Sequence, residues 1–71
     1  MGSSLEETVV GIVRELKPTM DELRDELERR GIHLDGRVLR KVVANLVRAG
    51  VLCKEWDPGS KRFRLHLCVE P

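Results

Sequence analysis

One segment of the sequence, residues 36–49, combines basic side chains with a spacing that could bind an anion. On a helix that turns about 100° per residue, one arc of this segment holds no acid and four bases, namely Arg37, Arg40, Lys41 and Arg48. Ala44 and Asn45 complete the arc, and the small side chain of Ala44 permits close approach. Arginine can bind guanine, and asparagine adenine, through two hydrogen bonds each. This arc is a candidate surface for phosphates and base edges, and the simpler interpretation is a solvated helix face.

The other reactive side chains do not form a pattern that predicts catalysis or metal binding. Cys53, Cys68, His33 and His66 lack the C-x-x-C and H-x3-H spacings typical of zinc sites. The chain has no glycine-rich phosphate loop, and no Ser/His/Asp set stands in plausible proximity. The sequence therefore predicts no enzyme, no metal site and no cofactor.

Length and composition indicate one small domain spanning residues 1–71, with an ordered core of about residues 4–69. Hydrophobic residues make up 41% and charged residues 35%, which excludes a disordered chain and a membrane-embedded one. No apolar run reaches the roughly 18 residues of a membrane span. The N-terminus lacks the pattern of a signal peptide, so we expect a cytoplasmic location. Glutamine is absent and asparagine occurs once, which hints at a thermophile.

Charge is distributed unevenly along the chain. Residues 1–35 hold nine acids and five bases, a balance of −4, whereas residues 36–71 hold eight bases and three acids, a balance of +5; the two sum to the net charge of +1. A polarised small domain can offer one surface to a polyanion and keep another acidic. The charge pattern therefore favours an anionic partner for the C-terminal half.

Apolar residues at spacings of three and four predict three helices, at about 4–16, 19–30 and 36–49. The residues expected to delimit these helices are Pro18, Thr19, Gly31, Asp35 and Gly50. In the third helix, the arc opposite to the bases is apolar throughout, with Val38, Leu39, Val42, Val43, Leu46 and Val47. This helix is therefore expected to bury one face and expose the other.

After the third helix the apolar period changes to two, which predicts strands at 51–56 and 61–69. The connecting residues, 57–60, contain Pro58 in the second turn position and Gly59 in the third, a combination that favours a type II turn. A third short strand could form near residues 32–34 or before the second helix.

The predicted register of this hairpin pairs Trp56 with Lys61. It places four apolar residues on one face: Leu52, Phe63, Leu65 and Leu67. Cys53 and Cys68 stand four residues out of step in this register, too far apart for an unstrained disulfide, so we expect two small half-buried hydrophobic side chains. Trp56 is expected to pack at the sheet edge.

The order of helices and hairpin resembles the winged helix-turn-helix family of bacterial and archaeal regulators. The residues that carry the resemblance are Leu23, Leu27, Gly31, Ile32, Asp35, Val38, Leu39, Val42, Val43, Leu46, Gly50, Val51 and Leu52, followed by the strand-turn-strand. The resemblance covers about residues 5–69. It implies an α+β winged helix with a three-helix core and a C-terminal β-hairpin, in which residues 36–49 form the recognition helix and residues 54–64 the wing.

This resemblance implies a transcriptional regulator that binds double-stranded DNA. The recognition helix would enter the major groove, and the wing would contact the flanking backbone through Lys54, Lys61, Arg62 and Arg64. We expect a homodimer, because one module presents few base-contacting side chains. The alternative is a protein–protein interaction module of a larger replication, transcription or chromosome assembly, whose basic arc would meet an acidic protein surface. RNA is less favoured, because its deep, narrow major groove does not admit a helix.

Overall fold

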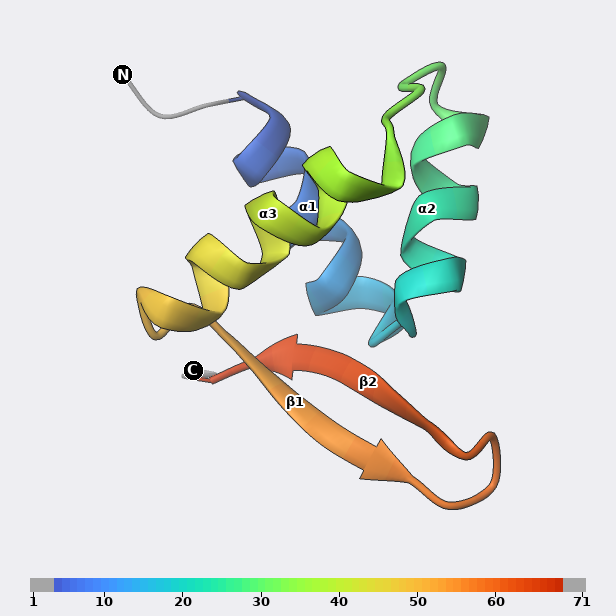
Figure 1. The fold of residues 1–71 in the computed structure, drawn as a ribbon, viewed down its shortest axis with the longest axis vertical. Coiled ribbons are helices and arrows are strands. Elements are labelled where there is room, and N and C mark those ends of the chain that lie inside the picture. The colour runs from blue at the N-terminus through green and yellow to red at the C-terminus, as the bar shows by residue number, and fades with distance from the viewer. Residues whose placement is uncertain (1–3, 69–71) are drawn as a thin grey trace.

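The computed structural model describes residues 4–68, without the side chain of Ser4, and shows three helices followed by an antiparallel hairpin (Figure 1). The elements in order are α1 (Ser4–Leu16), α2 (Met20–Arg29), α3 (Gly36–Arg48), β1 (Leu52–Asp57) and β2 (Arg62–Leu67). This order confirms the predicted α+β arrangement, which is consistent with a winged helix. The expected strand end at Val69 lies outside the described residues. None of the described helices is long and apolar enough to cross a membrane.

Side chains at the N-termini of α2 and α3 form the predicted caps. The hydroxyl of Thr19 accepts a hydrogen bond from the backbone N–H of Glu22 at 3.3 Å, and the Glu22 carboxylate accepts one from the backbone N–H of Thr19 at 3.0 Å. These reciprocal bonds are a capping box, which satisfies two otherwise unpaired donors. The carboxylate of Asp35 caps α3 by accepting from the N–H of Arg37 at 2.9 Å.

Residues with positive φ end each helix, as the breakers in the sequence predict. Gly31 and Gly50 have φ of 82° and 81° after α2 and α3, a conformation that glycine adopts without steric cost. Lys17 has φ of 47° at the end of α1, directly before Pro18. The chain therefore turns sharply between consecutive helices.

The core consists of aliphatic side chains from all five elements. They are Val9, Ile12, Val13, Leu23, Leu27, Leu39, Val43, Leu46, Leu52, Leu65 and Leu67. The apolar arc of α3 is narrower than the sequence predicts: Val42 and Val47 are half-buried, and Val38 remains 45% exposed. Both aromatic rings of the chain also lie outside this core, because Trp56 and Phe63 are exposed.

The hairpin has a different register from the one predicted. Trp56 pairs with Phe63, Leu52 with Leu67 and Cys53 with His66, a shift of two residues. Because side chains alternate with a period of two, this shift keeps every residue on its predicted face and changes only its neighbours. The prediction that four apolar residues share one face is thus confirmed, but only Leu52, Leu65 and Leu67 are buried there, whereas Phe63 is exposed.

The turn between the strands lies one residue later than predicted, at residues 58–61, and is not the predicted type II turn. Lys61 donates its backbone N–H to the carbonyl of Asp57 at 2.8 Å, and the positive φ of 56° lies at Lys61 instead of Gly59. The carboxylate of Asp57 accepts from the N–H of Gly59 at 3.0 Å and from the Ser60 hydroxyl at 3.1 Å. These side-chain bonds stabilise a four-residue loop, and the loop produces the shifted register.

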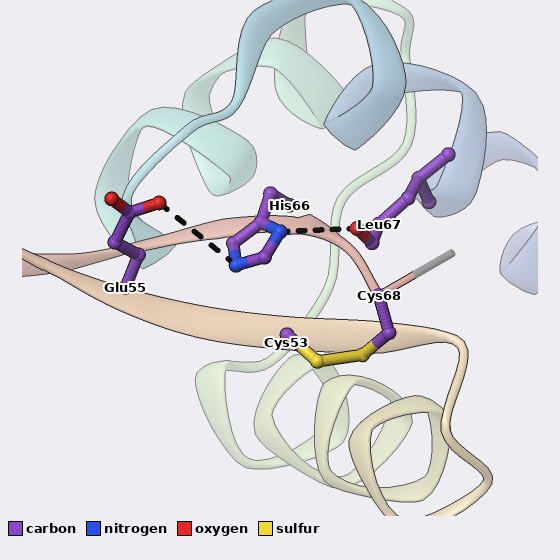
Figure 2. Close-up of a disulfide and its surroundings, with 5 residues drawn as sticks. All are labelled: Cys53, Glu55, His66, Leu67 and Cys68. Carbon is purple, nitrogen blue, oxygen red and sulfur yellow. Dashed lines mark hydrogen bonds and ion pairs between the residues drawn. A yellow bond between two sulfur atoms is a disulfide. The ribbon is translucent and has the colours of Figure 1, made fainter. Parts of the chain in front are cut away.

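Cys53 and Cys68 form a disulfide, so the prediction of two unbonded cysteines is wrong (Figure 2). The shifted register places them diagonally across the two strands, with 5.0 Å between their Cα atoms. Both residues are half-buried, as expected. Figure 2 shows the side chain of Leu67 pointing away from the disulfide, as strand alternation requires. The bond closes the end of the hairpin that follows α3.

A short pairing before α2 extends the hairpin on the side of β2. Leu65 donates its N–H to the carbonyl of Pro18 at 2.8 Å, and Thr19 forms an isolated antiparallel bridge with Arg64. Of the two positions predicted for a third short strand, the one before α2 thus carries a single bridge, and no third strand forms among the described residues. The bridge also fixes β2 to the junction between α1 and α2.

Removal of the disulfide should destabilise the fold. The bond joins residues 15 positions apart, and closure of a loop of this length corresponds to about 3 kcal/mol in the chain-entropy model. The double substitution Cys53→Ser/Cys68→Ser should therefore lower the free energy of unfolding by about 2–4 kcal/mol, measured by urea denaturation. Reductant should destabilise the wild type and leave the double variant unchanged. Equal stability of oxidised and reduced wild type would contradict this assignment.

Candidate nucleic-acid interface

The six predicted contact residues of α3 all lie on its exposed face. They are Arg37, Arg40, Lys41, Ala44, Asn45 and Arg48. The opposite face is fixed in the core by Leu39, Val43 and Leu46, which are at most 6% exposed. Packing of these three side chains therefore sets the rotation of α3 about its own axis, and this rotation directs the basic arc outwards. In the view of Figure 1, α3 crosses in front of α1.

The four bases of α3 have no ion-pair partner within residues 4–68. The arginines of α2 and its C-cap differ: Arg24 pairs with Glu28 at 3.6 Å, whereas Arg29 and the C-cap residue Arg30 both pair with Glu26, at 3.8 Å and 3.3 Å. Positive charge on α2 is thus compensated within the helix, whereas positive charge on α3 is not. An anion would meet uncompensated bases on α3.

Two arginines that the sequence assigned to the wing contact are engaged by carboxylates. Arg62 pairs with Asp21 on α2. Arg64 donates from Nε to the carboxylate of Asp57 at 2.7 Å, and from Nη1 to the carboxylate of Glu22 and the carbonyl of Lys17, both at 3.1 Å. Only tertiary structure brings these acids close. Because carboxylates partly compensate their charge, both arginines should attract a phosphate less strongly than the sequence alone indicates.

The two wing lysines remain available. Lys54 in β1 and Lys61 in the turn are exposed, and neither has an ion-pair partner in the part of the chain that the structure describes. The predicted site residues therefore fall into two groups. One comprises the α3 arc with Lys54 and Lys61, and the other comprises Arg62 and Arg64.

The bond between Arg64 and Asp57 perturbs both ionisable groups. The pKa of Asp57 lies below its ordinary value of 3.8, chiefly because Arg64 donates a hydrogen bond to the carboxylate, with further donation from Gly59 and Ser60. The pKa of Arg64 is raised, chiefly by the same bond to Asp57. This pair holds the end of β1 against β2, so it positions the wing.

No group of three metal-ligating side chains occurs among the described residues. His33 is exposed. His66 contacts the carbonyl of Leu67 at 3.0 Å through Nδ1 and lies 4.0 Å from the carboxylate of Glu55 (Figure 2).

Comparisons with protein-family models, with curated proteins and with solved structures gave no match to this chain. The assignment of a function therefore rests on the arrangement of the elements and on the chemistry of the exposed residues.

The acidic limb of the stability profile should depend on Asp57. Its lowered pKa means that its stabilising contribution is present above pH 3.8 and is lost as pH falls through the lower folded-state pKa. The wild type should therefore lose more stability than Asp57→Asn when the pH is lowered from neutrality to below 3.8, measured by thermal unfolding. Parallel pH profiles for the two proteins would show that the carboxylate does not stabilise the wing.

Proposed function

We propose that this chain is a winged helix-turn-helix domain that binds double-stranded DNA, with α3 in the major groove and the hairpin on the flanking backbone. The observation that carries the proposal is the exposed arc of α3, where four bases lack a carboxylate partner within residues 4–68. Uncompensated basic side chains release counterions from DNA when they meet phosphates, and this release dominates affinity.

The shape of α3 supports binding in a groove. A major groove about 12 Å wide accepts one α-helix, provided that the inserted face carries no acid and is not bulky throughout. The exposed face of α3 meets both conditions, because Ala44 lies between its long basic side chains. Arg37, Lys41 and Arg48 form one line along the helix. Asn45 is exposed on the same arc, and the amide of an asparagine can bind an adenine edge.

A role in transcriptional regulation follows from the same proposal. If the exposed arc of α3 recognises DNA, as proposed, the domain would act by occupying its site. Lys54 and Lys61 in the hairpin would contact phosphates beside the groove. Arg62 and Arg64 would contribute mainly by holding the hairpin against α2.

Protein–protein interaction is the alternative function, and one surface favours it. A hollow of about 400 Å³ lies between α1 and the end of α3 and is lined by Val10, Gly11, Leu46 and Val51, with Glu6, Glu7 and Arg14 around them. A second copy of the chain or another protein could cover such a surface. In this alternative, the α3 arc would meet acidic side chains.

Substitution of two α3 bases tests the leading proposal. Arg37→Ala/Lys41→Ala should weaken binding of blunt duplex DNA by about tenfold to several hundredfold, if one of the two side chains contacts a base. Both side chains are exposed and alanine favours helix, so the fold should persist. Fluorescence anisotropy measures the affinity, and circular dichroism checks the fold.

A matched control is available on α2. Arg29→Ala/Arg30→Ala removes the same charge, but from arginines that Glu26 already pairs, so it should change affinity much less. Equal losses in the two double variants would indicate a general charge effect. Wild-type affinity of Arg37→Ala/Lys41→Ala would remove α3 from the interface and favour the protein-interaction alternative.

Salt dependence provides an independent measurement. If three to five of the bases on α3 and the hairpin contact phosphates, the slope of log affinity against log salt should be about −3 to −4.5, from about −0.9 per phosphate. Arg37→Ala/Lys41→Ala should make this slope shallower. An affinity for duplex DNA that does not change with salt would contradict the proposed electrostatic contact.

A further inference from the structure

The two aromatic residues of the chain, Trp56 and Phe63, both lie on the surface of the hairpin. The sequence contains one tryptophan, one phenylalanine and no tyrosine. Trp56 is 52% exposed and Phe63 is 54% exposed, whereas the core is built from aliphatic side chains alone. Aromatic side chains usually contribute large buried areas to a core. Because these two rings are exposed instead, we infer that they contact a ligand at the surface.

The rings form a directly opposed cross-strand pair near the turn of the hairpin. Their centroids are 5.1 Å apart and their planes are inclined by 70°, an edge-to-face arrangement. In this geometry the ring that presents its edge keeps both of its own faces clear of the other ring. The pair stabilises the hairpin. Because about half of each side chain is exposed, ring surface remains accessible to a planar ligand.

Two unpaired lysines flank the rings. Lys54 lies on the same face of the hairpin as Trp56 and Phe63 by strand alternation, and Lys61 precedes β2 in the turn. The lining of a hollow of about 300 Å³ includes these four side chains, and Thr19, Met20, Arg62 and Leu65 complete it. This volume falls at the lower end of the range for ligand pockets. The hollow thus combines apolar ring surface with positive charge.

We propose that this hollow, with Trp56, Phe63, Lys54 and Lys61, binds an unpaired nucleotide of a DNA strand. The base stacks on the accessible ring surface, and its phosphates contact the two ammonium groups. Such a combination of aromatic rings and positive charge binds single strands without sequence preference, because every base has a π face. Bases inside an intact duplex are covered by their neighbours, so the site selects overhangs, frayed ends or melted segments. The inference extends the proposed binding of duplex DNA and rests on it only for its biological setting.

The chain carries its own reporter for this site, because Trp56 is its only tryptophan and it has no tyrosine. The experiment titrates the full chain with oligothymidylate and with an abasic strand of the same length, which has the same phosphates and no bases. Oligothymidylate should quench the fluorescence of Trp56 and bind about 5- to 100-fold more tightly than the abasic strand. Phe63→Leu, which keeps the reporter and an apolar side chain, should reduce this preference.

Leu16→Ala is the matched control, since Leu16 is a comparably exposed apolar side chain on α1 (52%), and it should leave the preference intact. Circular dichroism checks that Phe63→Leu is folded, and binding of blunt duplex DNA, which we propose depends on α3, tests the duplex proposal separately. Equal affinity for the two single strands, or unquenched Trp56 with oligothymidylate bound, would overturn the inference even if duplex binding persists. A blue shift of Trp56 emission with protein concentration alone would also overturn it, because a second copy would then cover the rings.

Discussion

The guanidinium group of Arg64 joins three parts of the molecule that are distant in sequence. It binds Asp57 at the end of β1, the carbonyl of Lys17 after α1, and Glu22 in the first turn of α2. The same Glu22 oxygen accepts the backbone N–H of Thr19, so the cap of α2 and the anchor of the hairpin share one carboxylate. Charge-assisted bonds of this kind are stronger than neutral ones, and they fix how the hairpin is oriented on the helices.

The ion pairs that anchor the hairpin also determine which charged side chains of the molecule are compensated. Asp21 and Glu22 at the start of α2 pair with Arg62 and Arg64. Further along the helix, Glu26 and Glu28 pair with arginines within four residues of them. The bases of α3 receive no such partner within residues 4–68. A net charge of +1 therefore conceals four bases on α3 and two hairpin lysines that have no carboxylate partner within residues 4–68. The local potential around such bases attracts a polyanion even when the net charge is small.

The hairpin shows where pattern alone is ambiguous. A period of two determines which face each residue occupies, but registers that differ by two residues have the same faces. The choice between them lies in the turn, where Asp57 binds Gly59, Ser60 and Arg64, and Arg64 in turn reaches α2. Two further contacts fit only the shifted register: the ring pair of Trp56 and Phe63, and the disulfide of Cys53 and Cys68.

The sequence by itself determined the order of the elements, the caps at Thr19 and Asp35 and the separation of apolar and basic arcs on α3. These features depend on neighbours within one helical turn, so local spacing is sufficient to predict them. Tertiary structure alone decided that Arg62 and Arg64 pair with α2, that the cysteines bond, and that Trp56 and Phe63 stay outside the core. Each of these outcomes depends on the register of the two strands and on the position of the hairpin relative to α2. Both are set by packing of the whole chain.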